Sequence, residues 1–316
     1  MHILVHGAGA VGGYFGALLA RGGHDVTFVA RGENLAALSA HGLVVRLGSE
    51  TLHLAPVRAV PDPAAAPRPE LVLVCVKSYD TPAAAAALRR VVAPDTIVLS
   101  LQNGIENEDV LARGLGLPPL MVALTRIGVA LVAPATIDYS GRGTILFGEP
   151  DGSESPRARR VAEALAAASV PYELRRDILV AAWEKLAWNA GFNAVTTLTR
   201  RTVAEVLAEP ASRALVVAAM EEVDAVAVAS GVPVRRRRTE RVLEESRSGL
   251  PDFQTSMLQD LLRGRRLEHD ALNGAVVRAG ARSGIAVPMN RTLLALLARL
   301  DPGSRFSDRG PTTGHA

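Results

Sequence analysis

A lysine and two asparagines stand four residues apart in an otherwise apolar segment, at Lys185, Asn189 and Asn193. Side chains at this spacing lie on the same face of a helix, so the pattern predicts one polar stripe. Polar groups among apolar neighbours need hydrogen-bonding partners. Either a pocket for a small polar anion or the neighbouring helices could supply them, and the spacing alone does not choose between the two.

A second polar cluster lies between residues 253 and 274. Ser256 belongs to a segment with a helical pattern, Gly264 breaks that pattern, and Glu268 opens the next helical segment. The Ser256 and Glu268 side chains could converge across the break. Alternatively, Ser256 is an ordinary helix residue and Glu268 is a first-turn acid that the helix dipole favours.

A glycine-rich loop comes directly after the first predicted strand, residues 3–5, and opens the helix predicted over residues 14–21. In such a loop the first glycine makes the turn, the second lets the backbone approach a pyrophosphate, and the third packs the helix on the strand. The phosphates then meet the N-terminus of the helix. This context predicts a dinucleotide-binding loop formed by Gly7, Ala8, Gly9, Ala10, Val11 and Gly12.

The second predicted strand, residues 26–30, is followed by Arg31. NAD-specific sites usually have an acid here that binds the ribose hydroxyls, whereas a guanidinium can hold a 2′-phosphate through two hydrogen bonds. Arg31 therefore favours NADPH over NADH. The alternative is a solvent-facing arginine with no ligand, and Glu33 lies close by in the sequence.

Lys77 and Asn103 each follow a predicted strand, residues 71–76 and 97–101 respectively. Ligands of an open parallel sheet bind outside the carboxyl ends of its strands. Both side chains are therefore expected near a nicotinamide or its substrate. The dipeptide Asn103-Gly104 is also common in simple turns.

Lysine is rare in this chain: of 35 basic residues, only Lys77 and Lys185 are lysines. Lysine and arginine replace each other on a solvated surface, but not where a compact ammonium must give up a proton. The two lysines are therefore candidates for functions that arginine cannot perform, although a biased composition also leaves a few lysines by chance.

The order of strand and helix patterns predicts an α/β fold. Strands and helices alternate up to about residue 172, which is typical of a doubly wound, mostly parallel sheet with helices on both faces. The Ala- and Pro-rich residues 55–69 are predicted to form a loop. Beyond this part only helical patterns follow, at residues 177–198, 203–230, 235–247, 253–262, 267–283 and 290–300. We expect an N-terminal domain over 1–172, an all-α C-terminal domain over 173–300 and a disordered tail over 301–316.

Composition narrows the class of protein. The 316 residues are 48% hydrophobic, carry a net charge of +3 and include one cysteine, Cys75, so we expect a cytoplasmic protein without disulfides. No signal sequence, membrane span or His and Cys cluster for a metal is evident, and neither a membrane nor a metal is expected. The arginines at 235–238 are followed by acids, which favours a solvated helix face over a nucleic-acid site. The helices near 203–230 could pack between the subunits of a homodimer or within the core.

Taken together, the motifs resemble the ketopantoate reductase family over roughly residues 1–300. The glycine loop with Arg31 is followed, in the family's order, by Val76-Lys77, Gln102-Asn103-Gly104, Lys185-Leu186-Ala187-x-Asn189-x-x-x-Asn193, Ser256-Met257-Leu258-Gln259-Asp260 and Glu268-x-Asp270-x-x-Asn273-Gly274. The resemblance implies a Rossmann domain, a helical second domain and reduction of 2-dehydropantoate by NADPH to (R)-pantoate.

The resemblance also implies a role for each candidate residue. Lys185 would be the general acid, and Glu268 would orient the Lys185 side chain or tune it electrostatically. Substrate would be bound by Asn189, Asn193, Ser256 and Asn103, and the cofactor by the glycine loop, Arg31, Lys77 and Asn103.

Two other functions stay open. One is a sister NADPH-dependent reductase of another 2-oxo acid or ketone, since the groups that bind a carboxylate and a ketone would be shared. Departures from the family pattern at Tyr139, Leu267 and His269 bear on this substrate question. The other is a non-catalytic NADPH-binding sensor, which would need the glycine loop and Arg31 but not Lys185 together with Glu268.

Overall fold

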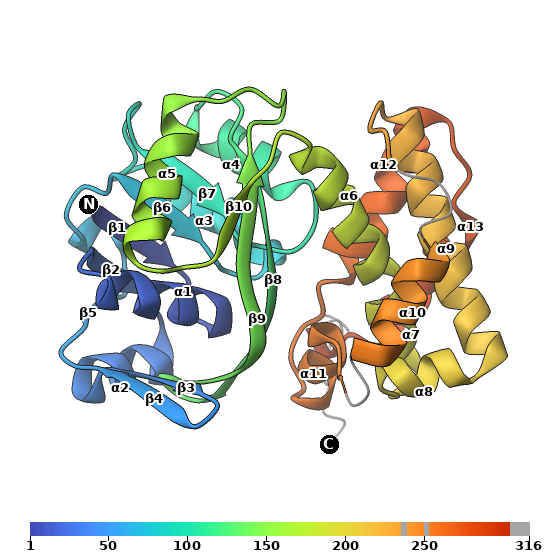
Figure 1. Ribbon diagram of the computed structural model, residues 1–316, viewed down its shortest axis with the longest axis horizontal. Coiled ribbons are helices and arrows are strands. Elements are labelled where there is room, and N and C mark those ends of the chain that lie inside the picture. Colours follow the sequence, from blue (N-terminus) through green and yellow to red (C-terminus); the bar gives the residue numbers. More distant parts are fainter. Residues whose placement is uncertain (235–238, 250–252, 304–316) are drawn as a thin grey trace, which may run out of the picture. The chain divides into compact units, whose positions relative to one another are not determined.

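The computed structural model describes residues 1–234, 239–249 and 253–303. The chain divides into two compact units, Met1–Leu179 and Val180–Ala316, and Figure 1 shows strands and helices in the first and helices in the second. No helix in the described part of the chain is long and apolar enough to cross a membrane. The α/β class with a helical C-terminal part is therefore confirmed, while the domain limits at 172 and 300 remain a prediction.

Five parallel strands form the first sheet, in the order β5-β2-β1-β6-β7. They are β1 (His2–His6), β2 (Asp25–Val29), β5 (Arg58–Val60), β6 (Leu71–Val74) and β7 (Ile97–Ser100). The chain runs from β1 to β2 on one side and later returns to β6 on the other, so the strand order reverses at β1. Ligands of doubly wound sheets bind at such a switch point, beyond the carboxyl ends of the strands.

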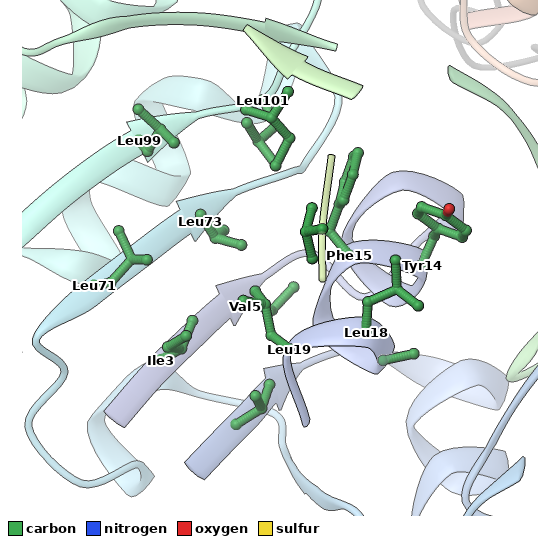
Figure 2. Close-up of a cluster of buried hydrophobic side chains, with 14 of the residues drawn as sticks. Ile3, Val5, Tyr14, Phe15, Leu18, Leu19, Leu71, Leu73, Leu99 and Leu101 are labelled. Carbon is green, nitrogen blue, oxygen red and sulfur yellow. The ribbon is translucent and has the colours of Figure 1, made fainter. Parts of the chain in front are cut away.

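Alternate residues of β1 face two different apolar layers. Ile3 and Val5 belong to a cluster that includes Phe15 of α1 (Ala10–Arg21), and Figure 2 shows this cluster. Leu4 belongs to a second cluster with Leu88 of α3 (Thr81–Leu88). Full burial of each such side chain contributes about 1.5–3 kcal/mol. The central strand is therefore fixed from both faces, and so is the loop that follows it.

The remaining helices of the first unit continue these two layers. Residues of α5 join the cluster of α1, and residues of α4 join that of α3. The helices are α2 (Gly32–His41), α4 (Asn107–Leu115) and α5 (Pro156–Ala167). The Ser155 side chain begins α5 by accepting a hydrogen bond of 3.1 Å from the Ala158 amide. Helices thus cover both faces of the first sheet, as predicted.

A second, mixed sheet follows the order β10-β9-β3-β4, and β8 also pairs with β9. Its strands are β3 (Leu43–Leu47), β4 (Glu50–Leu54), β8 (Val122–Ala133), β9 (Thr136–Gly148) and β10 (Tyr172–Leu174). The prediction of a mostly parallel sheet holds for the first sheet alone. The predicted loop over 55–69 is wrong in detail, because it contains β5 and a 3-10 turn, Pro63–Ala65. Three residues at a sheet edge are too short to show a strand period.

The second unit is helical throughout its described residues. Its elements are α6 (Ile178–Trp188), a first π turn (Asn189–Asn193), α7 (Ala194–Thr199), α8 (Val203–Ala208), α9 (Pro210–Ala229), α10 (Thr239–Gly249), α11 (Ser256–Leu262), a second π turn (Asp270–Gly274), α12 (Ala275–Ser283) and α13 (Pro288–Leu300). Both π turns interrupt helices that the sequence predicts as continuous.

The helix predicted over 203–230 is two helices, α8 and α9, because the chain breaks at Glu209-Pro210. Proline lacks an amide hydrogen and therefore suits the first position of a new helix. The Glu209 carboxylate accepts hydrogen bonds from the Ala211 and Ser212 amides at 3.0 and 2.6 Å. The arginine run at 235–238 and the tail residues 304–316 lie outside the described residues.

Candidate functional site

The glycine loop after β1 is tightly packed on its inner side and open at its middle glycine. Gly7 has φ +106°, and a Cβ there would lie 2.7 Å from the Val76 amide nitrogen. A Cβ on Gly12 would lie 2.2 Å from the Gly7 carbonyl oxygen, whereas one on Gly9 would meet nothing within 4 Å. Gly9 begins α1 without a side-chain cap. The loop therefore suits a phosphate that approaches the backbone at Gly9 and the first-turn amides.

Arg31 lies two residues beyond β2, is exposed, and is the N-cap residue of α2. Asn34 fixes this start of α2 to the glycine loop, because its Nδ2 donates a hydrogen bond of 2.7 Å to the Ala8 carbonyl oxygen. Its Oδ1 accepts a hydrogen bond of 2.7 Å from the Ala135 amide. The sequence analysis missed Asn34, since an asparagine in a first helical turn carries no signal of a contact 26 residues away.

His6, the last residue of β1, is buried directly before the glycine loop. Burial, together with the positive charge of Arg31 and against the opposing effect of Asp62, lowers the pKa of its imidazole to about 4. His6 is therefore neutral at pH 7. The residue directly before the glycine loop is thus uncharged, and Arg31 contributes positive charge near it.

A buried hydrogen-bond network joins the segments that carry Lys77 and Asn103. Gln102 Nε2 donates to the Val76 carbonyl oxygen at 2.9 Å and to Thr81 Oγ1 at 2.8 Å. The Ser78 hydroxyl and Asn107 Nδ2 each donate a hydrogen bond of 2.7 Å to the Asn103 carbonyl oxygen. The structure therefore brings the chain after β6 and the chain after β7 together.

Lys77 and Asn103 are both half-buried, and each stands three residues beyond the end of its strand. β6 ends at Val74 rather than at residue 76, so Lys77 stands three residues beyond it and precedes a 3-10 turn, Ser78–Asp80. Gly104 has φ +102°, which lets the chain turn directly after Asn103. The first unit therefore places the glycine loop, Arg31, Lys77 and Asn103 after neighbouring strands of one sheet.

In the second unit, Lys185 lies in the last turn of α6 and is half-buried. Asn189 and Asn193 are buried and are the first and last residues of the first π turn. A π turn contains one more residue than an α-helical turn. The three side chains therefore do not share one uninterrupted α-helix, and whether they form one polar stripe stays a prediction. Four-residue spacing in the sequence does not reveal such an inserted residue.

Aromatic packing anchors the segment between Lys185 and Asn193. The Trp188 and Phe192 rings have centroids 4.9 Å apart, and the Trp188 ring meets that of Phe253 edge-on at 6.3 Å. Trp188 Nε1 donates a hydrogen bond of 3.1 Å to the Ser246 hydroxyl. Side-chain position along this helix is thus fixed by packing as well as by backbone bonds.

Ser256 is exposed at the first position of α11, which Thr255 caps. The Thr255 and Thr196 hydroxyls share a buried hydrogen bond of 2.7 Å, and α11 contacts both α7 and the first π turn. Ser256 therefore begins an element that packs against the asparagine-bearing turn. Whether its side chain converges with that of Glu268 stays a prediction.

Glu268 is buried, directly before the helical turn that leads into the second π turn. Asp301 Oδ1 holds the preceding residue by accepting a hydrogen bond of 3.0 Å from the Leu267 amide. The next residue, His269, is partly buried, and burial lowers the pKa of its imidazole. The second unit therefore carries a carboxylate, an ammonium and two amides, the kinds of group that can bind an oxyanion and move a proton.

Comparisons with known proteins agree with both halves of this arrangement. Residues 3–152 match the family described as ketopantoate reductase PanE/ApbA, and residues 177–301 match its C-terminal family. The chain is 35% identical over 301 residues to a 2-dehydropantoate 2-reductase from Archaeoglobus fulgidus, covering 95% of this chain and 98% of the relative.

Two solved structures show the same likeness. A PanE/ApbA family ketopantoate reductase from Ralstonia eutropha JMP134 superposes with a TM-score of 0.88 at 35% identity, covering 96% of this chain and all of that one. A 2-dehydropantoate 2-reductase from Geobacter metallireducens GS-15 gives a TM-score of 0.89 at 32% identity, covering 95% and 99%. The chain belongs to the PanE/ApbA ketopantoate reductase family.

Proposed function

We propose that the protein reduces 2-dehydropantoate to (R)-pantoate with NADPH. The observation that carries this proposal is the match of both halves of the chain to one reductase family, together with 35% identity to a 2-dehydropantoate 2-reductase over 95% of the chain. The site residues add independent support, because they include the groups that such a reduction requires. A cytoplasmic location accords with the single cysteine, Cys75, which is partly buried and whose thiol pKa burial raises to about 12.

The first unit would hold the nicotinamide dinucleotide. The open backbone at Gly9 and the uncapped start of α1 fit a pyrophosphate. The exposed Arg31 guanidinium would bind the 2′-phosphate that distinguishes NADPH from NADH. Lys77 and Asn103, held after neighbouring strands, would lie toward the nicotinamide end.

The second unit would supply the proton and the substrate contacts. NADPH, when bound, would supply a hydride to the 2-oxo carbon, and negative charge would then develop on the former carbonyl oxygen. The Lys185 ammonium would stabilise that oxygen and donate its proton to it, so that ketone, hydride and proton together give the alcohol. Glu268 would orient the Lys185 side chain or tune it electrostatically. Asn189, Asn193 and Ser256 would bind the hydroxyl and carboxylate groups of the substrate, and Asn103 of the first unit would also contact the substrate.

The test is NADPH oxidation, followed by absorbance, with a panel of 2-oxo acids that differ in size and in their hydroxyl group. We expect 2-dehydropantoate to give the highest kcat/KM and the product to be (R)-pantoate. A higher value for an acid without the hydroxymethyl group would instead assign the protein to the sister reductases of the family. Tight NADPH binding without turnover of any member would support the sensor function.

A further inference from the structure

The two π turns of the second unit are joined by one buried side chain. Asn273, in the second π turn, is fully buried, and its Nδ2 donates a hydrogen bond of 3.0 Å to the carbonyl oxygen of Ala190 in the first. Ala190 lies between Asn189 and Asn193, the two amides assigned to substrate. The same Nδ2 donates at 3.0 Å to Asn290 Oδ1. One amide therefore connects the asparagine-bearing turn to the rest of the unit.

The far end of this connection is anchored firmly. Asn290 Nδ2 donates to the Ala219 carbonyl oxygen of α9 at 3.0 Å and to Glu222 Oε2 at 2.8 Å. The Glu222 carboxylate also accepts hydrogen bonds from the Met289 and Asn290 amides, at 2.7 and 2.8 Å, at the start of α13. A buried network whose members bond one another specifies one arrangement of its elements. Asn273 thus relies on a rigid support.

The first π turn is also held from its opposite side. A Cβ on Gly191 would lie 3.1 Å from both Cγ1 and the carbonyl oxygen of Val216 on α9, so a side chain there would require Val216 to shift by a few tenths of an ångström. Close packing at Gly191 and the hydrogen bond to Ala190 therefore restrain adjacent residues of the same turn. Without the side-chain donor, the buried Ala190 carbonyl would lose this bond and the turn could relax toward α-helical bonding. Such a change would rotate Asn193 relative to Asn189.

We propose that Asn273 is a positioning residue, which holds the first π turn so that Asn189 and Asn193 present their amides together to the substrate. The proposal rests on the proposed function, since it takes both asparagines as substrate contacts. It adds a residue that touches neither substrate nor cofactor. A side chain serving packing alone would not need a hydrogen-bond donor at this place.

The test compares Asn273→Ala and Asn273→Asp with Leu297→Ala in the full chain. Leu297 is fully buried on α13 and forms none of the hydrogen bonds of the network, so its truncation should lower stability while leaving the Asn273 donor in place. Amide hydrogen exchange is measured over residues 189–195, together with KM and kcat for 2-dehydropantoate and the Kd for NADPH. The exchange readout requires no substrate, so it remains valid even if the proposed function is wrong.

We expect both Asn273 variants to exchange faster over 189–195 and Leu297→Ala to leave this segment protected. We also expect KM for the 2-oxo acid to rise about tenfold, with kcat and NADPH affinity changed much less. The Asn273→Asp variant should recover KM as pH falls, because a protonated carboxyl can donate to Ala190 and a carboxylate cannot. Unchanged exchange in both Asn273 variants, or an equal rise in KM for Leu297→Ala, would overturn the proposal.

Discussion

The Ser78 hydroxyl donates a hydrogen bond of 2.7 Å to the carbonyl oxygen of Asn103, across 25 residues of sequence. Because Ser78 directly follows Lys77, this bond ties together the two strand ends that carry Lys77 and Asn103. Asn107 Nδ2 donates to the same oxygen at 2.7 Å, and its Oδ1 accepts from the Thr81 hydroxyl at 2.9 Å. The placement of two expected site residues thus depends on hydrogen bonds made by Ser78 and Asn107.

Asn107→Ala should therefore weaken both the fold and the site. It removes one donor to the half-buried Asn103 and the acceptor of the buried Thr81, and we expect a loss of about 1–3 kcal/mol in the free energy of unfolding. NADPH affinity should fall as well. Ser78→Ala is the matched variant: it leaves the Asn107 bond to Asn103 in place and should lose less on both measures. Denaturant titration and NADPH fluorescence titration measure the two effects, and equal losses would contradict this ranking.

Arg31→Ala should reduce the preference for NADPH over NADH. Loss of a charge-assisted contact to the 2′-phosphate is expected to raise KM for NADPH about 10- to 100-fold. KM for NADH should change little, because NADH has no 2′-phosphate. Arg89→Ala, which removes an exposed arginine at the end of α3, controls for the loss of one positive charge. A similar rise in KM for NADPH and for NADH would mean that Arg31 does not bind the 2′-phosphate.

His6 predicts a loss of stability in acid. Its pKa falls from 6.5 to about 4 on folding, so between these values the unfolded chain binds more protons than the folded one. Stability present above pH 6.5 is therefore lost as pH falls, by roughly 2 kcal/mol at pH 5 and about 3 kcal/mol at pH 4.

His6→Leu should remove this contribution. The difference in unfolding free energy between pH 7 and pH 5 should shrink by about 2 kcal/mol relative to the wild type. Comparing the two proteins cancels the other titrating groups, including His269. Denaturant titrations at both pH values measure the difference, and parallel behaviour of the two proteins would show that the His6 pKa is not lowered.

Periodicity predicted the parallel sheet around β1 and most helices, because each buries a long or regular apolar face. It did not reveal the second sheet, because β3, β4 and β10 are partly exposed and lack the continuous apolar run of the buried strands β1, β6 and β7. It also missed the break at Glu209-Pro210, where the apolar pattern continues through a change of helix.

At the candidate site, residue type and motif located the glycine loop, Arg31, Lys185 and Glu268, because their chemistry is rare or ordered along the chain. The side chains that hold these residues in place were not predicted. Asn34, Asn107 and Asn290 act through contacts that span many residues, and no local pattern signals such a contact. The π turn at Asn189–Asn193 was not predicted for a different reason. The spacing of residues along the sequence is the same whether the backbone forms an α-helical turn or a π turn.

The most direct test of the proposed chemistry is turnover of 2-dehydropantoate with NADPH by the wild type, Lys185→Ala and Lys185→Arg, with NADPH affinity measured in parallel. We expect both variants to bind NADPH as the wild type does and to lose kcat by about 100-fold or more, Lys185→Arg included, because a guanidinium keeps the charge but does not release its proton. Near-normal kcat in Lys185→Arg would show that charge alone suffices and that Lys185 is not the acid. Near-normal kcat in Lys185→Ala would contradict the mechanism altogether.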